Sequence, residues 1–143
     1  MTSRAHIAEI FVRALYPLLL ICSILFLFRG HNAPGGGFIA GLIAVAASAS
    51  YALVFSSVKA QKMMPLEPLR LTGLGILLAL MSGLPATIDG LTFLSHPWWT
   101  LSFGVFEFSV STVMLFDLGV YLAVWGTFGG LCTMMINSIE EDV

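Results

Sequence analysis

The chain has 143 residues, of which 58% are hydrophobic and only 10% are Asp, Glu, Lys or Arg, with a formal net charge of -2. A soluble domain is about 25% charged, so these few charges cannot cover a soluble globule of this size. The composition predicts an integral membrane protein. It excludes a disordered chain, a disulfide-stapled secreted domain and a nucleic-acid-binding protein, which would need a basic surface.

Four apolar stretches are long enough to cross a membrane, because a hydrocarbon core of about 30 Å requires about 20 helical residues. They cover about 7–28, 36–56, 69–91 and 113–136. The sequence therefore predicts an all-α membrane protein with four transmembrane helices in a single domain, 1–143. The short connections leave no room for a soluble catalytic domain, so we expect no enzymatic activity.

The segment between the first two spans is the most unusual part of the sequence. It reads RGHNAPGGGF at 29–38, with three consecutive glycines, which have free φ angles and exposed amides. Non-helical backbone at membrane depth is tolerated only where it is buried in protein or lines a cavity. We therefore expect this segment to serve assembly or an ion path, with a plain interhelical turn as the alternative. The candidate residues are Arg29, Gly30, His31, Asn32, Pro34, Gly35, Gly36, Gly37 and Phe38.

Small residues recur at helical spacing in the second and fourth spans. Such residues let helix backbones approach closely in lipid. Packing among the chain's own helices and docking onto another subunit both fit this pattern. The candidate helix-packing residues are Gly41, Ala44, Ser48, Gly119, Gly126 and Gly130.

The segment between the third and fourth spans predicts a different structure. A proline at 85 precedes Asp89, so the third helix is kinked or ended there. Asp89 is either a charge within the membrane or already outside it. Tryptophans at 98 and 99 are typical of the membrane interface. Residues 100–112 partly alternate between apolar and polar, which predicts an extended or hairpin-like loop on the external side.

Basic residues set the predicted orientation. With four spans, the two termini and the middle loop share one face, and that face holds five of the six cations. The positive-inside rule makes this face cytoplasmic, which predicts an N-in, C-in topology. The cations on this face are Arg4, Arg13, Lys59, Lys62 and Arg70, and Arg29 lies on the opposite side.

Ionisable groups inside the spans are expected to be paired, hydrated or functional. Glu9 and Arg13 are spaced i, i+4, which predicts a local ion pair. Asp117 follows Leu115 and Phe116 inside the fourth span. We expect it to pair with Arg29 or His31, or to lie on an ion path. No spacing of His and Cys predicts a metal site, since Cys22 and Cys132 lie in separate apolar runs.

Two segments, RGHNAPGGGFIAGL at 29–42 and LFDLGVYLAVWG at 115–126, resemble the characteristic blocks of the B subunit of Mrp-type multisubunit sodium/proton antiporters, the MnhB family. The resemblance covers essentially the whole chain. It implies a membrane subunit of a hetero-oligomeric complex in the bacterial cell membrane, with other membrane subunits as partners. The chain would support assembly or the sodium pathway. Na⁺ and H⁺ would be transported ions, and no cofactor is implied. In the second segment, the positions that match the family's characteristic block are Phe116, Asp117 and Gly119.

Two other functions remain open from the residues alone. A self-sufficient four-helix exporter of the small multidrug-resistance kind would need a carboxylate midway along the first span, whereas Glu9 lies at its edge. A purely structural membrane adaptor would have no role in ion movement. Transport by the purified chain alone would favour the exporter, and co-purification with several membrane subunits would favour the antiporter component.

Overall fold

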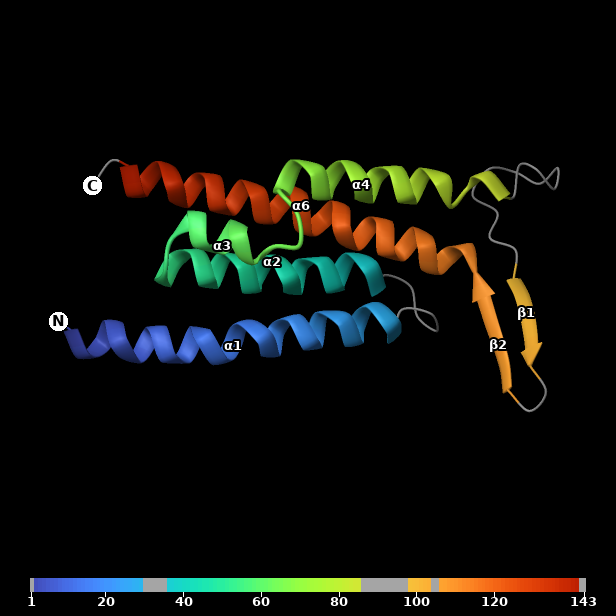
Figure 1. Cartoon of the computed structure of the whole chain (residues 1–143), viewed down its shortest axis with the longest axis horizontal. Helices are drawn as coiled ribbons and strands as arrows, with labels where there is room; N and C mark the ends of the chain where they lie inside the picture. Colours follow the sequence, from blue (N-terminus) through green and yellow to red (C-terminus); the bar gives the residue numbers. More distant parts are fainter. Residues whose placement is uncertain (1, 30–35, 86–97, 104–105, 142–143) are drawn as a thin grey trace.

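The computed structural model describes residues 2–29, 36–85, 98–103 and 106–141, and its helices lie side by side in an elongated bundle (Figure 1). Within these described residues, four helical stretches are long and apolar enough to cross a membrane, which confirms the predicted four-span architecture. The elements are α1 (Thr2–Arg29), α2 (Gly36–Val54), α3 (Ser57–Met63), α4 (Pro68–Met81), β1 (Trp98–Phe103), β2 (Phe106–Ser111) and α6 (Thr112–Glu141).

The helix α6 is the centre of the bundle, since it packs against both α2 and α4, while α1 packs mainly against α2. Both chain ends lie at the same end of the bundle, which an even number of spans requires (Figure 1). The core is small, because most side chains of α1 face outward: Phe11, Leu25 and Phe28 are each 62% exposed. Such a surface suits lipid or other membrane proteins. The core cluster consists of Ala40, Ala44, Val45, Met64, Leu71, Tyr121 and Trp125.

The predicted third span begins near residue 69, and α4 begins there at Pro68, but the short helix α3 that precedes it was not predicted from the sequence. The helical stretch from residue 57 to residue 81 is therefore broken. It consists of the seven-residue α3 and the 14-residue α4, with Met64–Glu67 between them. Prolines at 65 and 68 explain the break, because the residue before a proline is pushed into the extended region. Met64 (φ -74°, ψ 149°) and Glu67 (φ -55°, ψ 139°) have this conformation.

The segment before α6 forms an antiparallel hairpin of β1 and β2 at the end of the bundle opposite the chain termini (Figure 1). Its register pairs Trp99 with Val110 and Leu101 with Phe108, so the alternating apolar residues are partners across the hairpin. The side of the membrane on which it lies stays a prediction. The described part of α4 ends at Met81, and Asp89 lies outside the described residues.

Candidate functional site

The two unusual sequence segments meet in space, where the start of α2 packs against the start of α6. Gly36 and Gly37 are buried at the beginning of α2. A Cβ added at Gly37 would collide with the backbone carbonyl oxygen of Asp117. One turn further along α2, a Cβ at Gly41 would lie 2.8 Å from the Cβ of Val124. These glycines are therefore required by close helix approach, and the segment 36–42 is a helix-packing surface.

Asp117 lies on α6 beside the N-terminus of α2. Its side chain is half-buried, and its backbone is in contact range of Gly37. The N-terminus of a helix carries a partial positive charge that stabilises a nearby carboxylate. The fold therefore places this acidic residue next to a favourable dipole, in addition to any charged partner.

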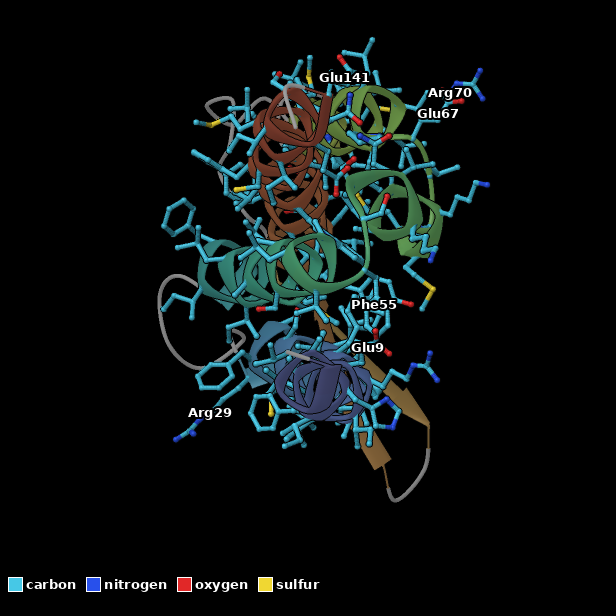
Figure 2. The ribbon with its side chains drawn as sticks, turned by 90° about the vertical axis from the view of Figure 1, so that its left-hand side faces the viewer. Glu9, Arg29, Phe55, Glu67, Arg70 and Glu141 are labelled. Atoms are coloured by element: carbon cyan, nitrogen blue, oxygen red, sulfur yellow. The ribbon has the colours of Figure 1, made fainter. Side chains whose placement is uncertain are left out.

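The predicted pair of Asp117 with Arg29 does not form. Arg29 is exposed at the end of α1, and its side chain points away from the bundle (Figure 2). The physical reason is that α1 packs against α2 and makes little contact with α6, so its last residue does not reach Asp117. The rest of the segment, Gly30, His31, Asn32, Pro34 and Gly35, lies outside the described residues. Phe38 lies on α2 and is 48% exposed.

The predicted ion pair between Glu9 and Arg13, both described residues of α1, is also not formed. The guanidinium carbon of Arg13 lies 5.3 Å from the ring centroid of Phe55, a cation–π arrangement. Phe55 stacks on Tyr51 with a centroid distance of 4.5 Å, and Tyr51 meets Tyr16 edge to face at 5.2 Å. The spacing predicted only that the two charges lie on one side of α1. In the structure, the guanidinium of Arg13 contacts the Phe55 ring at the end of α2 instead of Glu9.

A second set of glycines packs α4 against α6. A Cβ at Gly75 would collide with the backbone nitrogen of Ala123 and lie 2.6 Å from the carbonyl oxygen of Gly119. A Cβ at Gly119 would in turn lie 2.6 Å from the backbone nitrogen of Ala79. Gly126 and Gly130 make similar contacts with Thr72 and Pro68. The small residues thus face the chain's own helices, so the docking alternative does not apply to them.

Two buried serines make hydrogen bonds in the core that no sequence motif predicted. Ser48 is fully buried, donates to the carbonyl of Ala44 at 3.0 Å and accepts from the indole nitrogen of Trp125 at 2.9 Å. Ser23, also fully buried, donates to the carbonyl of Ala40 at 2.8 Å and lies 3.2 Å from the hydroxyl of Tyr121. The sequence signal for these bonds was the presence of serine within apolar helices, because a buried hydroxyl requires a hydrogen-bond partner.

A polar seam joins α3 to the last turns of α6, and it too has no signature in the sequence. The Ser57 hydroxyl lies 2.8 Å from a carboxylate oxygen of Glu140 and 2.9 Å from the side-chain oxygen of Asn137. The backbone N–H of Ser57 also points at Glu140, at 3.3 Å. Gln61 donates to the hydroxyl of Thr133 at 3.0 Å. These bonds fasten the short α3, and Glu140 acts as its N-terminal cap.

The described residues hold no group of three or more His, Cys, Asp or Glu side chains that could bind a metal ion. The polar groups gathered at the helix contacts are hydroxyls, amides and one carboxylate. These groups hydrogen-bond one helix to another. In the described part of the chain, the geometry is that of a packing scaffold.

Comparisons with known proteins agree with this geometry. The family model of a "domain related to MnhB subunit of Na+/H+ antiporter" matches residues 7–130. The chain is 34% identical over 131 residues to the B subunit of the Na(+)/H(+) antiporter of Bacillus subtilis (strain 168), and the match covers 87% of this chain and 85% of that protein.

Two further similarities involve much longer chains. A protein of Rhizobium meliloti (strain 1021), named as a probable K(+)/H(+) antiporter A/B subunit, is 32% identical over 124 residues, which is 84% of this chain but 12% of that protein. The solved structure of the Mrp complex from Dietzia sp. DQ12-45-1b contains a chain with a TM-score of 0.74 and 32% identity. That match covers 93% of this chain and 14% of the other.

Proposed function

This chain belongs to the family of MnhB subunits of Na⁺/H⁺ antiporters, and from this premise we propose that it works as a docking module of the larger antiporter. In this role it supports assembly and catalyses no reaction. Na⁺ and H⁺ are the ions that the whole complex exchanges. Its partners are the other membrane subunits.

One observation carries this proposal: the same four-helix unit occurs as a small segment of longer proteins. It corresponds to 12% of the relative that is named an A/B subunit and to 14% of a chain in a solved Mrp complex. A unit that is covalently joined to a larger subunit in some relatives is a neighbour of that larger subunit. We therefore infer that this chain makes the equivalent contact without a covalent link, with an A-type subunit.

Co-purification tests this proposal. An affinity tag on this chain, expressed together with the other subunits, should retain the A-type subunit when the membrane is solubilised in mild detergent. A tag on an unrelated membrane protein of similar length, expressed in the same cells, is the control. Recovery of the tagged chain alone, with the other subunits present in the membrane, would contradict the proposal.

We also propose an N-in, C-in orientation, which rests on the distribution of the cations. The chain ends and the turn between α2 and α3 lie toward one end of the bundle (Figure 1), and Lys59 follows that turn in the first turn of α3. A fluorescent protein that folds only in the cytoplasm should be fluorescent when fused after residue 143. A dark fusion that is inserted at normal levels would reverse the orientation.

A role on the sodium pathway can be separated from assembly at Asp117. The backbone of Asp117 lies where the start of α2 packs against α6. If the residue only supports packing, Asp117→Asn should lower the yield of the complex and leave the exchange rate per complex unchanged. Normal yield with lost exchange would assign Asp117 to the ion path.

A further inference from the structure

The break between α3 and α4 places two charged residues deep within the span. Pro68 begins α4 and packs against α6, with its Cβ 2.7 Å from the position of a Cβ at Gly130. One turn later Leu71 is 1% exposed in the same core cluster as Ala44. Ala44 lies about 12 Å from one end of α2 and about 15 Å from the other, at 1.5 Å per residue. In Figure 1, α4 begins above the middle of α2.

The two charged residues are Glu67 and Arg70, and both point outward from the bundle (Figure 2). The Arg70 side-chain nitrogen lies 3.2 Å from a carboxylate oxygen of Glu67. The side chains are 74% exposed for Arg70 and 71% for Glu67. Leu69, between them in the sequence, is 84% exposed. Charged groups near the bilayer centre are strongly unfavourable when they face lipid, even as a pair. This surface therefore requires cover.

The surroundings of Glu67 carry an excess of positive charge. Lys62, on the last turn of α3, is exposed and lines a groove of about 310 Å³ together with Leu66 and Glu67. One carboxylate thus lies among two cations, Lys62 and Arg70. A second copy of this chain would bring the same excess against itself, so a self-dimer is disfavoured. An acidic group on a different protein would balance it.

We propose that this surface, the break face formed by Lys62, Leu66, Glu67, Leu69 and Arg70, docks against a transmembrane helix of another antiporter subunit that presents a carboxylate to Lys62 and Arg70. The proposal rests on the proposed function, since it requires that the chain assembles with other membrane subunits. It adds the face that is used and the chemistry of the partner. The break between α3 and α4 matters for this contact, because it exposes cations deep within the membrane span, where a continuous apolar helix would have none.

Photocrosslinking in the intact complex tests the contact directly. A photoreactive phenylalanine analogue at Leu69 leaves both charges of the ion pair in place. Irradiation of membranes that contain all subunits should give one crosslinked product. Its partner peptide should come from a transmembrane segment of another subunit, with an Asp or Glu within one helical turn. Crosslinks to phospholipid alone, to a second copy of this chain or to a segment without an acidic residue would overturn the proposal.

Charge substitutions supply the second test. Arg70→Glu should lower the recovery of the partner subunit by about tenfold, because it leaves the partner carboxylate buried beside another acid. Replacing that carboxylate with lysine should restore recovery. Arg29→Glu, at an exposed cation pointing away from the bundle, is the matched control and should leave recovery unchanged.

A charge swap guards against simple misfolding. Glu67→Arg with Arg70→Glu keeps a local pair at i, i+3 and the same net charge, so the chain itself should insert at normal levels. It moves the positive group away from the partner and should still lower recovery. Full recovery of the swap variant would overturn the proposal. If the unmodified chain recovers no other subunit, the proposed function fails; if it recovers the subunits while Leu69 crosslinks only lipid, the docking face alone fails.

Discussion

The two helices of the third span, α3 and α4, are held against α6 in different ways. Along α4 the backbones touch, because glycines on both helices leave no side chain between them. Along α3 the contact consists of side-chain hydrogen bonds from Ser57 and Gln61 to the end of α6. An isolated helix shorter than about 12 residues is marginal, so the seven-residue α3 depends on these bonds. The 14-residue α4 is held by the close fit of its backbone against the backbone of α6.

The largest effect should come from the backbone contacts of α4. Gly75→Val would force methyl groups into the backbone of Ala123, which cannot move aside as a side chain can. We expect a loss of about 3 kcal/mol in helix packing, at the upper end for overpacked sites. Thermal denaturation of the full chain in detergent measures this loss.

Gly73→Val is the matched control, two residues away on the same helix. A Cβ at Gly73 meets nothing within 4 Å, so valine there should leave the denaturation temperature nearly unchanged. Equal loss for both variants would contradict the close-packing account, because Gly73 has open space and valine has a higher helix propensity than glycine.

Gly37→Val should come next, because its Cβ would collide with the carbonyl of Asp117 where the two characteristic segments meet. We expect a loss of about 1–3 kcal/mol and a lower yield of the complex on native gels. His31→Ala should lower the yield less. If His31→Ala lowered the yield of the complex more than Gly37→Val, the segment 29–38 would act mainly through its polar side chains.

The seam along α3 should respond to a smaller degree. Glu140→Ala removes the acceptor for the backbone N–H and hydroxyl of Ser57, which should destabilise α3 by about 1–2 kcal/mol, as for the loss of a helix cap. Faster amide hydrogen exchange within α3 is the measurement.

Glu141→Ala is the graded comparison for that variant and should destabilise α3 less, because the Glu141 carboxylate reaches Ser57 only through Asn137. In addition, Glu140→Ala combined with Ser57→Ala should be less harmful than the sum of the single variants. Full additivity would mean that the two side chains do not act on each other.

The smallest effect concerns Arg29 and Asp117. Since Arg29 points away from the bundle, Arg29→Gln should change the yield of the complex very little. Its combination with Asp117→Asn should equal the effect of Asp117→Asn alone. A double variant that recovers part of the loss would show that the two charges pair in the assembled complex.

Apolar length was enough to predict the number of spans, because hydrocarbon thickness sets a strict requirement. It was not enough to find α3, since Lys59 and Lys62 give the segment after Val54 the character of a polar loop. Pro65 and Pro68 carried the signal for the break, in a stretch whose polarity is typical of a connection between spans.

The charge pairs were the weakest predictions, for a physical reason. Spacing along one helix gives the side on which Arg13 lies, but not which neighbouring helix faces that side; the neighbour proved to be the aromatic end of α2. Contacts between helices, such as the bond of Trp125 to Ser48, depend on the packing of the whole bundle. The glycine contacts were easier to predict from the sequence, because small residues at a fixed helical spacing indicate that two helices approach closely.

Ion exchange in sealed vesicles tests most directly whether this chain works only within a larger antiporter. The purified chain reconstituted alone should produce no Na⁺-dependent proton movement, measured with an internal pH dye. The co-purified complex, reconstituted at the same number of chains per vesicle, should produce it. Exchange by the chain alone, above that of empty vesicles, would contradict the account and identify a self-sufficient transporter.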